Sequence, residues 1–161
     1  MQRQQADPSP REPVDPDVDL RLARAPRRWI DDSAVLAVIA LGGAAGAAAR
    51  YLIGTAWPAA PGSLPWATLA VNVVGCALIG VLMVMVSDVW TGQRLLRPFL
   101  GTGVLGGFTT FSTYTVDIQR LVADRHPGTA LVYLGGTAAG ALLAVWVTAH
   151  TTRSLVNRRL R

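Results

Sequence analysis

Four apolar stretches determine what this chain can fold into. Each is long enough to cross the hydrocarbon core of a bilayer as a helix, for which about 17–25 residues suffice. The composition, 51% hydrophobic and 16% charged over 161 residues, also differs from that of a soluble domain. The sequence therefore predicts an all-α integral membrane protein with one four-helix domain, residues 34–150. Its predicted helices run from about Ala34 to Ala56, Trp66 to Ser87, Arg97 to Val122 and Thr129 to Thr148.

The segments outside this domain are polar. Residues 1–33 hold seven of the ten acidic residues and few large apolar ones, which is typical of a disordered tail. They lack the basic start and short apolar run of a secretory signal, so we expect this segment to stay on the protein. Residues 151–161 form a second, basic tail with four arginines.

The arginines are distributed unequally between the two sides of the predicted bundle. Counted from Arg21 onward, ten lie on the side that holds both termini and the 88–97 loop, against two on the other side, or three if Arg50 faces that way. Loops rich in arginine stay in the cytoplasm, so both termini are predicted to be cytoplasmic. The arginines flank the apolar stretches and form no aromatic-interleaved patch, which argues against nucleic-acid binding.

The third stretch contains a segment, GTGVLGGFTTFSTYT at residues 101–115, that is unusual for a membrane helix. It holds four glycines and six serines or threonines in fifteen positions. Glycine pairs and β-branched residues weaken a helix, so we expect a break near Gly106–Thr109. Open backbone in a membrane must be buried in protein, line a wet path or hold an ion. The segment is therefore the candidate functional site.

Polar residues in the other helices have two possible roles. Arg50 either extends to the membrane interface or lines an aqueous vestibule. The Asn72 amide either bonds another helix or solvates an anion with its N–H donors. Tyr133 and Thr137 lie four residues apart, on one helix face. The lone Cys76 excludes an intramolecular disulfide and a cysteine metal site.

The three helices that carry these residues resemble the Fluc (CrcB) fluoride channels. GGAAGAAARY at residues 42–51 is similar to a glycine-rich family segment that ends in arginine. ATLAVNVVGCALIG at residues 67–80 is similar to the family's second-helix pattern around an asparagine. LGGFTTFSTY at residues 105–114 matches the third-helix signature almost letter for letter.

The resemblance implies a channel that exports cytoplasmic fluoride passively across a bacterial cell membrane and so relieves fluoride toxicity. It implies an antiparallel dimer with two pores and a structural sodium ion at its centre, held by backbone carbonyls at Gly106 and Thr109. The other positions that match the family's pore are Arg50, Asn72, Phe111, Ser112, Thr113, Tyr114, Tyr133 and Thr137.

Two positions depart from the family pattern. Tyr114 replaces the commoner phenylalanine and adds a hydroxyl that either tunes conduction or bonds across the dimer interface. Ala141 stands where the fourth helix often has another hydroxyl, which truncates the polar track. The arginine bias, in addition, favours one fixed orientation, so we expect the partner in the dimer to be a homologous subunit of opposite topology rather than a second copy of this chain.

Other function classes fit the sequence less well. A small four-helix proton-coupled multidrug transporter needs a membrane-embedded carboxylate, and the apolar stretches offer only Asp117, near the end of the third. A purely structural membrane subunit would explain two pairs of glycines four residues apart, Gly42/Gly46 and Gly136/Gly140, which let another helix approach closely. It would not explain the glycine-broken hydroxyl segment. The sequence shows no recognisable catalytic spacing and no phosphate loop, so it does not indicate an enzyme.

Overall fold

The fold is a bundle of four membrane-crossing units, one of which is interrupted. The computed structural model describes residues 29–90 and 95–159. The helices in this part of the chain are α1 (Trp29–Ala56), α2 (Trp66–Asp88), the π-helical η2 (Pro98–Leu105), α3 (Gly106–Phe108), α4 (Ser112–Ala123) and α5 (Pro127–Arg159). The prediction of an all-helical protein with four crossings is confirmed. Among the described residues, α1, α2 and α5 are long and apolar enough to span a membrane uninterrupted.

The long helices extend beyond the predicted domain boundaries. The first begins at Trp29, before residue 34, and α5 continues through the basic segment to Arg159. Disorder was predicted for residues 1–33; residues 1–28 lie outside the described part of the chain, and residues 29–33 are helical instead, as the start of α1.

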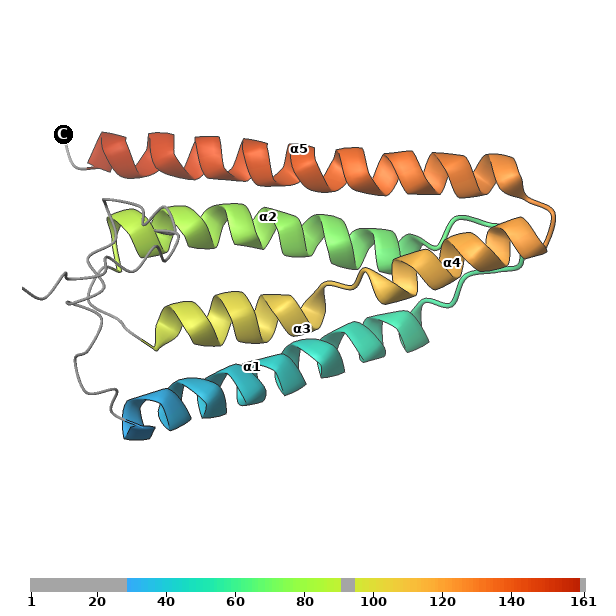
Figure 1. The fold of residues 1–161 in the computed structure, drawn as a ribbon. Coiled ribbons are helices and arrows are strands. Elements are labelled where there is room, and N and C mark those ends of the chain that lie inside the picture. The colour runs from blue at the N-terminus through green and yellow to red at the C-terminus, as the bar shows by residue number, and fades with distance from the viewer. Residues whose placement is uncertain (1–28, 91–94, 160–161) are drawn as a thin grey trace, which may run out of the picture.

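The helices pack in two pairs. α2 lies along α5, and α1 lies along η2 and α3, while α4 packs on α5 (Figure 1). The start of α1, the end of α2 and the end of α5 lie at one end of the bundle, and the α1–α2 and α4–α5 connections lie at the other (Figure 1). This arrangement places the most arginine-rich segments of the described chain at one end.

Glycines let α1 and the third crossing approach closely. A Cβ at Gly42 would lie 2.6 Å from the Phe99 carbonyl oxygen, and one at Gly46 would overlap the backbone at Val104. The GxxxG pair of α1 therefore packs against η2, as small residues do at membrane helix contacts. On the other side of this contact, Gly107 packs against the backbone of Gly43.

The break in the third crossing lies later than Gly106. Gly106 is helical, with φ −65° and ψ −36°, whereas Thr109 is extended, with φ −73° and ψ 156°. The chain resumes as a helix at Ser112. The prediction of a break near Gly106–Thr109 is confirmed, and the break falls at the later end of that range because the glycine pair lies where the third crossing packs against α1.

Candidate functional site

The break is held by a side chain from another helix. Asn72 Nδ2 on α2 donates a 2.9 Å hydrogen bond to the Thr110 carbonyl oxygen, and the Thr110 backbone N–H donates a 2.8 Å bond to Asn72 Oδ1. In a continuous helix this N–H would donate to the carbonyl of Gly106. The Asn72 amide thus replaces the helical partners that the backbone loses at the break.

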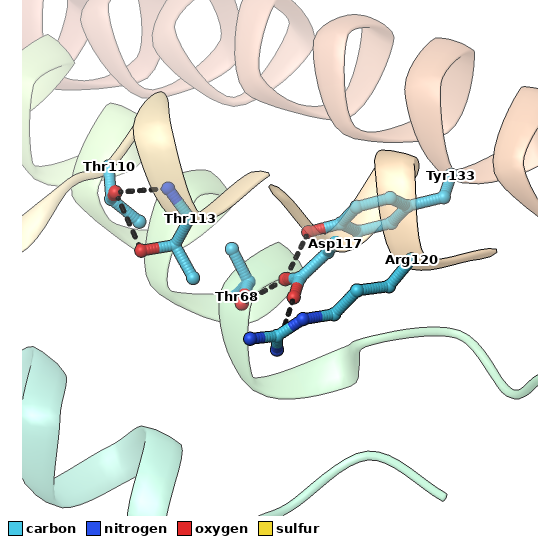
Figure 2. Close-up of polar contacts among 6 residues, drawn as sticks. All are labelled: Thr68, Thr110, Thr113, Asp117, Arg120 and Tyr133. Carbon is cyan, nitrogen blue, oxygen red and sulfur yellow. Dashed lines mark hydrogen bonds and ion pairs between the residues drawn. The ribbon is translucent and has the colours of Figure 1, made fainter. Parts of the chain in front are cut away.

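The hydroxyl of Thr110 starts the next helix. The Thr113 backbone N–H donates to Thr110 Oγ1 at 3.1 Å, as in a helix N-cap, and Thr110 Oγ1 donates to Thr113 Oγ1 at 3.0 Å (Figure 2). Ser112 Oγ lies 3.3 Å from the same Thr110 oxygen. The hydroxyls of Ser112 and Thr113 therefore gather around a buried Thr110, which the sequence analysis did not single out.

A groove opens beside the break, between α2 and α5. Its volume is about 330 Å³. We call it the pore groove, and it is lined by Asn72, Cys76, Thr109, Thr110, Phe111, Tyr114, Thr137, Ala138 and Ala141. Five of the predicted site residues, from three separate elements, therefore line one space.

The two aromatic residues of the signature lie at this groove. The ring centroids of Phe111 and Tyr114 are 5.9 Å apart, and the Phe111 side chain is 79% exposed. The Tyr114 hydroxyl donates a 2.7 Å bond to the Leu134 carbonyl oxygen on α5. Within this chain, the extra hydroxyl of Tyr114 thus fixes the ring to α5.

Thr137 has an unusual environment among the groove residues. It is 4% exposed, and its Oγ1 has no hydrogen-bond partner among the described residues. Buried hydroxyls are normally bonded, so Thr137 is an exception among the residues of the groove.

Arg50 lies on the opposite side of the break from the pore groove. Its Nε donates a 3.2 Å bond to the Gly107 carbonyl oxygen, near the end of α3. The residue also lines a cavity of about 250 Å³ together with Thr68, Thr110 and Thr113. This chamber therefore combines a guanidinium, which attracts anions, with several hydroxyl-bearing side chains on a largely apolar wall.

Tyr133 does not lie where a hydroxyl track along the groove would need it. It is fully buried and is packed in a cluster with Leu121 and Ala130. Its hydroxyl lies 3.4 Å from Asp117 Oδ2, which also accepts a 2.9 Å bond from Thr68 Oγ1 (Figure 2). The Arg120 guanidinium is 4.0 Å from the other carboxylate oxygen. Of the predicted track, Thr137 alone lines the pore groove.

The predicted metal site involves the backbone on both sides of the break. Gly106 directly follows η2, and its carbonyl loses its usual helical donor because the Thr110 N–H binds Asn72 instead. Thr109 is the first extended residue, so its carbonyl points out of the helical direction. Freed carbonyl oxygens are suitable ligands for a hard cation, and these two positions therefore fit a sodium ion.

Comparison with known proteins places this chain in a family. Residues 37–149 match the family described as CrcB-like protein, Camphor Resistance (CrcB). A fluoride-specific ion channel FluC 2 of Streptomyces avermitilis is 52% identical over 96% of this chain and 98% of its own length. A fluoride-specific ion channel FluC 1 of Streptomyces coelicolor is 52% identical over 85% of this chain and 90% of its own. A FluC 2 of Nocardia farcinica is 56% identical over 71% and 81%. The chain is a multi-pass membrane protein that belongs to the CrcB family.

Proposed function

We propose that this chain is a subunit of a fluoride-specific ion channel that lets cytoplasmic fluoride leave the cell passively. The observation that carries the proposal is the pore groove at the break, where Asn72, Phe111, Tyr114 and Thr137 line one space. Relatives named fluoride-specific ion channels, which align over almost the whole chain, support it.

The groove has the chemistry that a small, strongly hydrated anion requires. Asn72 uses one amide hydrogen on Thr110 and keeps the other for a ligand. The Thr137 hydroxyl is available in the same groove. The edges of the Phe111 and Tyr114 rings carry partial positive charge and attract an anion without the strength of a full charge. Weak, distributed contacts of this kind allow an ion to leave as readily as it enters.

The chamber beside Arg50 supplies ions to this path. A guanidinium raises the local concentration of anions, and Thr68, Thr110 and Thr113 provide hydroxyls nearby. Thr110 lines both the chamber and the pore groove, so an anion passing from one to the other moves around its side chain. The hydroxyls of Ser112 and Thr113 lie close to this crossing point.

We further propose that the subunit dimerises in antiparallel orientation around a sodium ion, held by the carbonyls of Gly106 and Thr109 from each subunit. The ion supplies positive charge where two broken helices expose carbonyl oxygens. Replacing sodium by a large organic cation during purification should then lower the thermal stability of the dimer, and equal stability in both salts would count against the site.

Orientation decides which partner completes the dimer. Counted from Arg21 onward, ten arginines on one side of the membrane against two or three on the other favour a single orientation, with both termini cytoplasmic. We therefore propose a heterodimer with a homologous subunit of opposite topology. Reporters fused to the termini should report one orientation, and equal populations of both would contradict this proposal.

The test of function is fluoride efflux from liposomes, measured with a fluoride electrode. The purified chain is reconstituted alone and together with a homologous subunit from the same genome. We expect fluoride efflux from liposomes that hold the chain and its partner. Control liposomes loaded with chloride alone should release no fluoride. Flux from the chain alone would refute the heterodimer but not the channel. No flux in either sample would refute the channel and favour a structural role.

A transporter mechanism gains no support from Asp117, the acidic residue of α4. Its carboxylate accepts a hydrogen bond from Thr68, contacts Tyr133 and faces Arg120, so it is engaged by neighbours within the subunit.

A further inference from the structure

Cys76 lies in the pore groove, although no role is assigned to it. It follows Asn72 by four residues on α2, so the two side chains point to the same side of that helix. Across the groove, Thr137 and Ala141 are spaced in the same way on α5. The thiol is half-buried and belongs to the only cysteine in the chain.

A second observation indicates that this level of the groove is occupied by a polar ligand. The Thr137 hydroxyl is buried, lines the same groove and has no partner among the described residues. A hydroxyl in this environment requires an ion or water nearby. The unpaired hydroxyl beside the groove supports a polar occupant between Thr137 and Cys76 over a sealed packing contact between α2 and α5.

We propose that Cys76 lines the ion path beside Thr137, and that its thiol is a modification site at which small thiol-reactive molecules close the path. This inference rests on the proposed channel function. A group added to the sulfur projects into a groove of about 330 Å³ between α2 and α5. It displaces the ligand of Thr137 and replaces it with an apolar group that cannot solvate an anion.

The chemistry needs a thiolate and a disulfide-forming reagent. The Cys76 thiolate attacks the sulfenyl sulfur of methyl methanethiosulfonate. A new S–S bond forms, methanesulfinate leaves with the electron pair of the broken S–S bond, and the thiol proton passes to solvent. Dithiothreitol reverses the modification by thiol–disulfide exchange.

The experiment combines fluoride efflux with intact-protein mass measurement of this chain on the same liposomes, which hold the chain together with its homologous partner subunit. Methyl methanethiosulfonate should add one methylthio group to the chain and abolish its flux, and dithiothreitol should remove the group and restore the flux. The Cys76→Ala variant should give the same flux before and after the reagent, whatever its starting rate, and gain no mass.

A matched control moves the thiol to the other side of the helix. Val74 is two residues from Cys76, close to the opposite face of α2, and is 49% exposed. The double variant Val74→Cys, Cys76→Ala should be modified without loss of flux. This control separates closure of the path from a general effect of modifying α2.

The outcomes distinguish this inference from the channel itself. Modification of Cys76 with unchanged flux would overturn the inference and leave the channel standing, as would a thiol that does not react in the folded protein. Absence of flux before any reagent would overturn the channel function, and with it the closure of the path by modification. The mass of the treated protein would still show whether the Cys76 thiol is accessible from the groove.

Discussion

Replacing Asn72 by alanine tests whether the amide holds the break. The substitution removes two hydrogen bonds, of 2.9 and 2.8 Å, and leaves the Thr110 backbone N–H and carbonyl without their partner. Each unsatisfied buried group costs about 1–3 kcal/mol. Because the groove admits water, we expect a value near the lower end for each group, a total loss of about 2–4 kcal/mol.

The loss is measured by unfolding the purified protein from detergent micelles with increasing SDS, followed by tryptophan fluorescence. Asn72→Asp should also destabilise, because it keeps an acceptor for the Thr110 N–H but places a carboxylate oxygen against the Thr110 carbonyl. Thr55→Ala is the matched control, since its hydroxyl bonds only the Leu52 carbonyl of its own helix at an exposed position.

Flux and stability should fall together in the Asn72→Ala variant. The amide sets the backbone direction at the break, and the position of the Phe111 ring depends on that direction. An unfolding midpoint equal to that of the unaltered protein would refute this reasoning. A variant that is stable but lacks flux would show instead that Asn72 acts on the ion and not on the backbone.

Three further substitutions test other parts of the structure. Phe111→Ile should abolish fluoride efflux without loss of assembled protein, because the ring is 79% exposed in this chain and little packing depends on it; normal efflux would contradict the aromatic role. Gly46→Ala should lower stability to SDS by about 1–3 kcal/mol because its Cβ overlaps the η2 backbone, whereas Gly136→Ala, with nothing within 4 Å, should be neutral. Tyr114→Phe removes the bond to the Leu134 carbonyl and should cost about 1 kcal/mol in the same assay, and no loss would mean that water replaces the bond.

The number of crossings was predictable because each crossing depends only on the length of one local apolar stretch. Membrane thickness sets the length of an apolar stretch, and four stretches of sufficient length are visible in the sequence. The contact made by Gly42 and Gly46 was also predictable as a close helix approach, although its partner, η2, was not. Partners are set by the packing of the whole bundle.

Helix propensity predicted a break near Gly106–Thr109, but it could not identify the residue at which the helix ends. Glycine weakens a helix in isolation, but Gly107 in this fold packs against the backbone of Gly43 and stays helical. Helix propensity differs by about 1 kcal/mol between glycine and alanine, which is less than the two hydrogen bonds that Asn72 offers at Thr110. The stronger, long-range interaction decides where the chain opens.

The same reasoning explains which hydroxyls the sequence could not rank. Thr109, Thr110, Ser112 and Thr113 are chemically similar neighbours, and only the fold separates them. Thr109 bonds the Leu105 carbonyl of its own helix, whereas Thr110 caps α4 and contacts both polar spaces. The signal that was available for Thr110 was its place immediately after the glycine-rich helix, where a cap residue is needed.

The polar groups at the break fall into two sets: those that hold the backbone and those that are left to solvate an ion. Asn72 satisfies the Thr110 backbone, and Arg50 satisfies the Gly107 carbonyl, so the break is held by α1 and α2 from two sides. These atoms are bound in place and cannot follow a moving ion. The groups left for the ion are the second Asn72 N–H, the unpaired Thr137 hydroxyl and the exposed Phe111 ring edge. Each is weak, and a path built from them passes an anion without retaining it.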